Sequence, residues 1–140
     1  MVANYNEVLY DNETLNTERL ILRKFRKADT DDIFEYASDA ETLKFLIWDG
    51  ISKKDDVINN ITGFYWSRPG IYAITLKEGW KCIGCMDLRL DNENDKVSFG
   101  YILNRSYWGK GYMSETLLKL IDFCFNKLEV NRIEAEHYKG

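Results

Sequence analysis

The sequence predicts a single α+β domain of mixed α/β type, in which helices flank a central, mostly antiparallel sheet. Between residues 71 and 103, apolar residues recur in three short runs separated by polar turns, as in an antiparallel meander. Apolar residues at helical spacing mark the segments before and after these runs. Residues 130–137 alternate again after a crossover helix, which predicts a strand parallel to the one that precedes this helix.

Composition limits the possible classes of protein. The chain has 140 residues, of which 45% are hydrophobic and 30% charged, and this suits one globular domain. No apolar run approaches the roughly 20 residues that span a bilayer, and no signal-peptide pattern opens the chain. The net charge of −4 disfavours a basic nucleic-acid-binding surface. We therefore expect a cytoplasmic protein with neither a membrane nor a nucleic acid as partner.

The first half of the chain contains one predicted strand and several helical segments. Residues 1–16 are polar and aperiodic, which predicts a loose N-terminal arm or a partner-dependent strand ahead of a domain spanning residues 17–140. A strand is expected within 17–25, where an apolar centre lies between charged flanks. Asp29 is expected to cap a helix over residues 30–40, whose acidic first turn suits the helix dipole.

Two further helical segments are expected before the meander. Residues 41–48 have room for another turn or two of helix. Ser52 followed by Asp55 resembles a capping box, and the helix that it opens is expected to stop at Arg68-Pro69-Gly70.

The meander is predicted to consist of strands over residues 71–76, 81–90 and 97–103. Its second strand contains Cys82 and Cys85 in a C-x-x-C pattern. A redox pair would favour a helix N-terminus, and a zinc site would need two more ligands. We therefore expect structural cysteines and no metal.

A turn with two glycines, Gly109 and Gly111, follows the third strand of the meander. Glycines allow a tight bend that leaves amides uncovered, and the next helix adds unpaired N–H groups and a positive dipole end. The pattern indicates an anion-binding turn, although an ordinary strand-to-helix bend would also fit it. The buried stripe of the helix is predicted to be Leu117, Leu118, Ile121, Cys124, Phe125 and Leu128.

Two separated motifs resemble a known family. They are Thr17-Glu18-Arg19-Leu20-Ile21-Leu22-Arg23 and Gly100-Tyr101-Ile102-Leu103 followed by residues 108–115. With the helix after Asp29, they look like the GNAT superfamily of N-acetyltransferases, and most like the branch with the ribosomal-protein amino-terminal acetyltransferases. The resemblance runs to Gly140 and implies the acyl-CoA N-acyltransferase fold, with a parallel, splayed strand pair at the cofactor site. It also implies direct acetyl transfer from acetyl-CoA to a primary amine, either a peptide amino terminus or a small amine, in a ternary complex.

The resemblance also implies the residues of the site. The donor's pyrophosphate would lie on the turn, and its pantetheine arm would pair with the edge of the preceding strand. The donor-binding residues are then Ile102, Leu103, Arg105, Gly109, Lys110, Gly111, Tyr112, Met113 and Ser114. Trp48, Tyr65, Trp66 and Tyr72 would wall the acceptor pocket, with core packing as the alternative for each.

Besides Trp108 and Met113 at the two ends of the glycine signature, two departures from the family pattern bear on catalysis. Ser98 stands where many relatives carry a glutamate, although a protonated amine must lose a proton before it attacks. Glu134, Asp87 and Ser98 are therefore all open candidates for handling this proton, and direct loss to bulk water is a further alternative. Relatives also continue past the strand at 130–137 with a helix and two strands. The alternative function is therefore a truncated, non-catalytic module that binds CoA or a partner. An exposed final edge would favour a homodimer.

Overall fold

The computed structural model describes residues 1–44, 50–63, 66 and 68–135. Its helices are α1 (Tyr5–Asp11), α2 (Thr30–Ala37), α3 (Ala40–Leu43), α4 (Lys54–Thr62) and α6 (Tyr112–Phe123), with 3-10 turns η1 (Lys27–Asp29) and η2 (Arg105–Tyr107) and a π-helical turn η3 (Cys124–Leu128). Its strands are β1 (Leu15–Asn16), β2 (Leu20–Arg23), β3 (Ile71–Leu76), β4 (Cys82–Asp91), β5 (Lys96–Leu103) and β6 (Arg132–Ala135).

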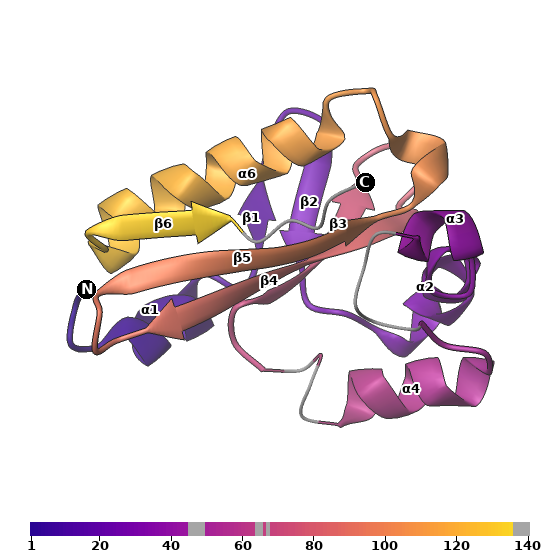
Figure 1. The fold of residues 1–140 in the computed structure, drawn as a ribbon, viewed down its shortest axis with the longest axis horizontal. Helices are drawn as coiled ribbons and strands as arrows, with labels where there is room; N and C mark the ends of the chain where they lie inside the picture. Colours follow the sequence, from indigo (N-terminus) through magenta and orange to yellow (C-terminus); the bar gives the residue numbers. More distant parts are fainter. Residues whose placement is uncertain (45–49, 64–65, 67, 136–140) are drawn as a thin grey trace.

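The described strands form one six-stranded sheet in the order β1-β2-β3-β4-β5-β6 (Figure 1). Every neighbouring pair is antiparallel except β5–β6, which is parallel. The predicted mixed fold, its antiparallel meander and its parallel final pair are therefore confirmed. The short turns of the meander force antiparallel neighbours, whereas the crossover through α6 brings β6 back in the direction of β5.

Helices pack against both faces of the sheet. Alternate residues of β3 belong to different core clusters: Tyr72 and Ile74 pack with α1 and α6, whereas Ile71 and Ala73 pack with α2 and α4. Figure 1 shows α6 running above β5 and β6, and α2, α3 and α4 grouped together on the right of the view. Because successive side chains of a strand point to opposite faces, these two clusters are the two layers of the core.

The N-terminal segment is folded, so the prediction of a loose arm over residues 1–16 is wrong. Leu9 of α1 and Leu15 of β1 are buried in the same cluster as α6, and β1 pairs with β2. The Val2 N–H also donates to the Leu128 carbonyl. Two well-placed leucines supply the burial that the polar composition of this segment concealed.

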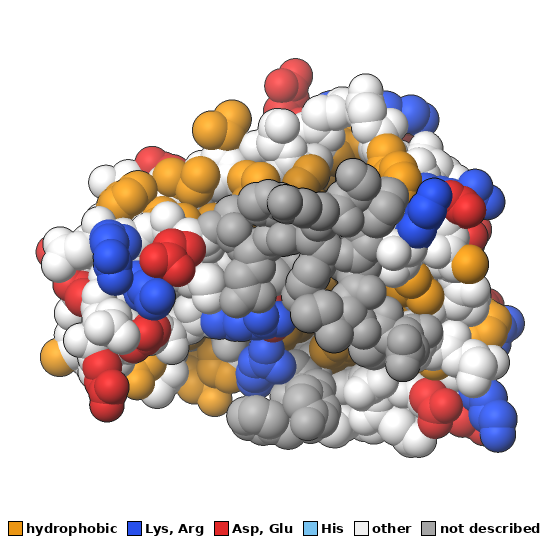
Figure 2. Space-filling model, viewed as in Figure 1, with side chains coloured by type: hydrophobic (Ala, Val, Ile, Leu, Met, Phe, Trp, Pro, Cys, Tyr) orange, Lys and Arg blue, Asp and Glu red, His pale blue; other side chains and the backbone are white. Residues whose placement is uncertain are grey.

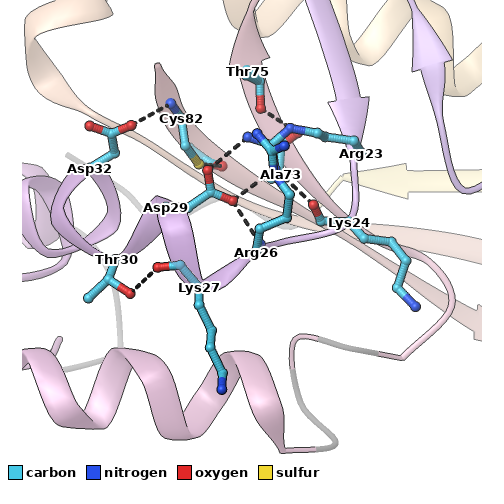
Figure 3. Close-up of polar contacts among 11 residues, drawn as sticks. Arg23, Lys24, Arg26, Lys27, Asp29, Thr30, Asp32, Ala73, Thr75 and Cys82 are labelled. Atoms are coloured by element: carbon cyan, nitrogen blue, oxygen red, sulfur yellow. Dashed lines mark hydrogen bonds and ion pairs between the residues drawn. The ribbon is translucent and has the colours of Figure 1, made fainter. Parts of the chain in front are cut away.

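Two of the predicted helix starts are corrected. The Asp29 carboxylate does not cap α2; it is buried and accepts hydrogen bonds from the Arg23 guanidinium and the Arg26 N–H (Figure 3). The capping box expected at Ser52 is absent, because α4 begins at Lys54 after an N-cap residue that makes no side-chain hydrogen bond. Helix α2 ends at Ala37 and α4 at Thr62, both earlier than expected.

The buried stripe predicted along α6 and η3 is confirmed at Cys124 and Leu128, with Leu117 and Ile121 partly buried against the core, and is wrong at Leu118 and Phe125. Leu118 is 69% exposed and Phe125 is 47% exposed, whereas the buried positions are Thr116, Leu120, Phe123, Cys124 and Leu128. Figure 2 shows hydrophobic side chains along the upper edge of the molecule, where Figure 1 places α6. The wider π-helical turn at η3 changes the residue spacing, so a single helical period does not describe the segment.

Candidate active site

The end of β5 runs past its pairing with β6. The parallel ladder joins Lys96 with Arg132 at one end and Phe99 with Ala135 at the other, whereas β5 stays paired with β4 up to Leu103. Within the part of the chain that the structure describes, residues 100–103 thus have a strand on one side only. Backbone groups on such an edge are available to an extended ligand that carries amides.

A turn and the start of a helix, residues 109–114, follow this edge and form a cradle of backbone N–H groups. Gly109 and Gly111 have φ angles of 73° and 81°, in the left-handed region that side chains disfavour, so the turn requires glycine at both positions. Gly111 is the N-cap of α6, and the first bond within the helix runs from the Glu115 N–H to the Gly111 carbonyl. The N–H groups of Tyr112, Met113 and Ser114 precede that bond and point out of the positive end of the helix.

Two cationic side chains predicted at this turn have different surroundings. The Lys110 Nζ lies 5.5 Å from the centre of the Tyr107 ring, on the exposed part of the loop. The Arg105 Nε lies 2.7 Å from the Asp39 carboxylate, and the Arg105 N–H donates to the Thr42 hydroxyl. Lys110 is therefore beside the cradle, whereas Arg105 joins the cradle loop to α3.

The residues just before β2 contact the helix that follows the cradle, and the sequence did not reveal this contact. Glu115 accepts hydrogen bonds from the Thr17 hydroxyl, the Arg19 N–H and the Arg19 Nε. Burial would raise the pKa of Glu115, but these hydrogen bonds outweigh it, so the pKa lies below its ordinary value. The only sequence signal for this contact is an acidic residue in the first turn of the helix.

A second contact that the sequence did not reveal joins α2 to the end of β5. The buried Asn104 side chain donates to Glu35 at 2.6 Å, and Lys81 donates to the same carboxylate at 2.8 Å. The hydrogen bond from Lys81 and the one from Asn104 prevail over burial and lower the pKa of Glu35. This network positions the residue at which β5 leaves the sheet.

The three candidates for proton handling lie on one face of the sheet. Ser98 is in register with Glu134 on β6, and Asp87 on β4 is in register with Gly100. Register partners and alternate residues of a strand share a face, so the structure brings these side chains into one strip.

Both carboxylates of this strip already hold basic partners. Asp87 accepts from Arg68 at 2.7 Å and from Arg89 at 3.0 Å, and Glu134 accepts from Lys96 at 3.3 Å. A Cβ on Gly100 would lie 2.8 Å from the Arg89 guanidinium, so the glycine gives Arg89 its space. Lysine and arginine side chains are visible near the middle of this face in Figure 2.

The predicted acceptor-pocket residues do not form one group. Trp66 is half-buried and stacks on Phe25, with ring centres 5.1 Å apart. Tyr72 is 1% exposed and donates its hydroxyl hydrogen to the Asn12 carbonyl, so it is a core residue rather than a pocket wall. The alternation of β3 places it on the α6 side of the sheet. Trp48 and Tyr65 lie outside the described residues.

The cysteines have the surroundings of structural residues. Burial raises the pKa of Cys82 and of Cys124 to about 12 and raises that of Cys85 as well. The described residues include no group of three or more His, Cys, Asp or Glu side chains placed to hold a metal. In the same part of the chain, no helix has the length and apolar character needed to cross a membrane.

Comparison with known proteins decides the family, because the family model of the acetyltransferase (GNAT) domain matches residues 19–140. The chain belongs to the GNAT acetyltransferase family. This GNAT domain is 40% identical over 129 residues to the uncharacterized N-acetyltransferase p20 of Bacillus licheniformis, which covers 89% of this chain and 72% of p20.

Solved structures share the fold of this GNAT domain. A GNAT-family acetyltransferase from Bacillus anthracis superposes with a TM-score of 0.75 at 24% identity, covering 87% of this chain and 72% of that one. RimL, a ribosomal alpha-N-protein acetyltransferase, superposes with a TM-score of 0.68 at 16% identity, covering 86% and 69%. The predicted resemblance is thus confirmed, and the domain belongs to a family of enzymes that use acetyl-CoA as acetyl donor.

Proposed function

We propose that this GNAT domain transfers acetyl from acetyl-CoA to a primary amine, by direct attack in a ternary complex. The observation that carries this proposal is that the backbone cradle at Gly109 and Gly111 follows residues 100–103, which pair with β4 alone among the described strands. An edge for amides followed by a cradle for phosphates matches, in order, the pantetheine and diphosphate parts of the donor.

The donor would be held mainly by backbone. The N–H groups of residues 111–114 would bind the diphosphate, and Lys110 would add a positive charge. Ile102 and Leu103 would lie beside the pantetheine arm. Acetyl-CoA supplies an activated thioester, whose carbonyl carbon forms the new bond to nitrogen while its sulfur leaves as the thiolate.

The acceptor amine must first lose a proton, and we assign this proton to Asp87 through water. Asp87 is opposite Gly100, where the one-sided edge of β5 begins, whereas Glu134 is opposite Ser98, where β5 is still paired. Ser98 and Glu134 are the alternatives. Asp87 accepts one hydrogen bond on each oxygen, from Arg68 and from Arg89, and each oxygen keeps a second lone pair on which the proton could be taken.

The acceptor class that we propose is the amino terminus of a peptide or protein, with a small amine as the alternative. The support is the fold that the domain shares with RimL, named as a ribosomal alpha-N-protein acetyltransferase. We further propose that two copies pair through β6, the last strand of the described sheet, in the cytoplasm. Analytical ultracentrifugation would test the pairing.

The deciding experiment separates donor binding from transfer. Saturating CoA at about 100 times its dissociation constant is expected to stabilise the domain by roughly 2.7 kcal/mol. Release of free thiol from acetyl-CoA is then measured with a peptide whose amino terminus is free or already acetylated. Absence of a thermal shift contradicts donor binding. A shift without thiol release supports instead the non-catalytic CoA-binding module, which the basic partners of Asp87 and Glu134 favour.

A further inference from the structure

We propose that Arg19 is a positioning residue for the diphosphate cradle. Its side chain contacts the cradle from the start of β2 and neutralises the Glu115 carboxylate. The proposal rests on the proposed donor site, and it adds a contact from the N-terminal part of the chain to that site. Residues 17–19 precede β2, and Glu115 lies in the first turn of α6.

One guanidinium contacts the cradle at three points. The Arg19 Nε donates to Glu115 at 2.7 Å, and the Arg19 Nη1 donates to the Lys110 carbonyl at 3.0 Å. The guanidinium carbon also lies 4.2 Å from the centre of the Tyr112 ring. Arg19 thus contacts the residue between the two glycines, the first residue of α6 and the fourth.

Gly111, the N-cap of α6, lies close to the same guanidinium. A Cβ built on Gly111 would lie 3.4 Å from the Arg19 Nη2, with no other heavy atom of the described residues within 4 Å. The turn has left-handed backbone at both glycines, and because glycine has wide conformational freedom, external contacts help to hold the amides of the turn in one arrangement. Arg19 supplies those contacts from the side of the sheet.

An anionic ligand can bind at this helix end only if the negative charge of Glu115 is neutralised, and the ion pair with Arg19 does this. A carboxylate in the first turn is favoured by the helix dipole, but alone it would repel a diphosphate bound at the same helix end. The hydrogen bonds from Thr17 and Arg19 hold this carboxylate against the start of β2 and place a positive charge beside it. The cradle therefore keeps its positive character despite the glutamate.

The test measures the dissociation constant of CoA by calorimetry for the wild type, Arg19→Ala, Glu115→Ala and the double variant. We expect Arg19→Ala to weaken CoA binding by at least about tenfold, because a charged hydrogen-bonding group is lost. The double variant is expected to bind at least about threefold more tightly than Arg19→Ala, since the unneutralised carboxylate is then gone as well. Lys54→Ala is the matched control, because it removes an exposed ion pair with Asp31 on another part of the surface.

The outcomes separate this inference from the donor site itself. A wild type that does not bind CoA contradicts the proposed function. A wild type that binds CoA, together with an Arg19→Ala variant of equal affinity or a double variant no better than Arg19→Ala, overturns the role of Arg19. A purely structural role would lower the urea midpoint without any recovery of affinity in the double variant. If Arg19→Ala fails to fold, Arg19→Gln, which keeps a long polar side chain but no charge, answers the same question by the same ratio with and without Glu115→Gln.

Discussion

The Arg105 guanidinium is paired with the Asp39 carboxylate at 2.7 Å, which connects the loop after β5 to the start of α3. Asp39 also accepts from the N–H and the hydroxyl of Thr42, so it caps α3 at the same time. The hydrogen bonds from Thr42, opposed by burial, and the charge of Arg105 lower the pKa of Asp39. Arg105, which the family resemblance places among the donor-binding residues, is thus held by a carboxylate at the start of the neighbouring helix.

Asp39→Asn is predicted to tighten CoA binding by about two- to threefold, because the asparagine still caps α3 but no longer competes for Arg105. Calorimetry with CoA measures the change. The control is Asp31→Asn, which removes an exposed carboxylate of α2 paired with Lys54. Weaker binding of CoA by Asp39→Asn would indicate instead that the ion pair holds the loop in its binding geometry.

Gly111→Asp is predicted to abolish CoA binding, because it places a carboxylate against the diphosphate and a side chain on left-handed backbone. Gly79→Asp is the matched control, since Gly79 has a φ of 84° and a Cβ there would meet no heavy atom of the described residues within 4 Å. Thermal shift with CoA is the measurement. Equal losses in the two variants would trace the effect to backbone strain rather than to charge.

Cys85→Ala is predicted to leave turnover within about twofold of the wild type, because a half-buried thiol with a raised pKa supplies no thiolate at neutral pH. The measurement is the rate of thiol release from acetyl-CoA with an amine acceptor. An inactive variant that keeps the wild-type urea midpoint would contradict the structural interpretation of this cysteine.

Asp29→Asn is predicted to lower the free energy of unfolding by about 3 kcal/mol, because it leaves the buried Arg23 without its counter-charge. Figure 3 shows this pair between β2 and the start of α2. The Arg23 Nε already has no hydrogen-bond partner among the described residues, so little compensation is at hand. Urea unfolding measures the loss. Removal of the exposed Lys54–Asp31 pair should cost below about 1 kcal/mol, and equal effects would refute the argument from burial.

Glu115 is predicted to contribute a pH-dependent part of the stability. Its pKa is below the ordinary value of 4.5, so its contribution is fully present above that value and is lost as the pH falls through the folded-state pKa. The difference in unfolding free energy between the wild type and Glu115→Gln should therefore be constant above about pH 5.5 and shrink toward acid pH. A difference that grows on acidification would contradict the assignment.

Local signals in the sequence were sufficient for most of the fold. The period of two in β3, β4 and β5 and the short turns between them determine an antiparallel meander, and the crossover after β5 determines the parallel β6. The two glycines also mark the cradle, because left-handed backbone selects glycine whatever the surroundings. These features depend on residues that are neighbours in the chain.

Tertiary structure alone decided the contacts between distant segments. Nothing in the pattern of residues 17–19 indicates that Arg19 meets Glu115, and the local sequence around the buried Asp29 is typical of a helix cap although this carboxylate pairs with Arg23. Tyr72 and Leu118 have similar apolar character, yet the first is buried and the second exposed. Periodicity indicates that a segment has an apolar face, but the packing of the layers decides which residues that face contacts and which charges it brings together.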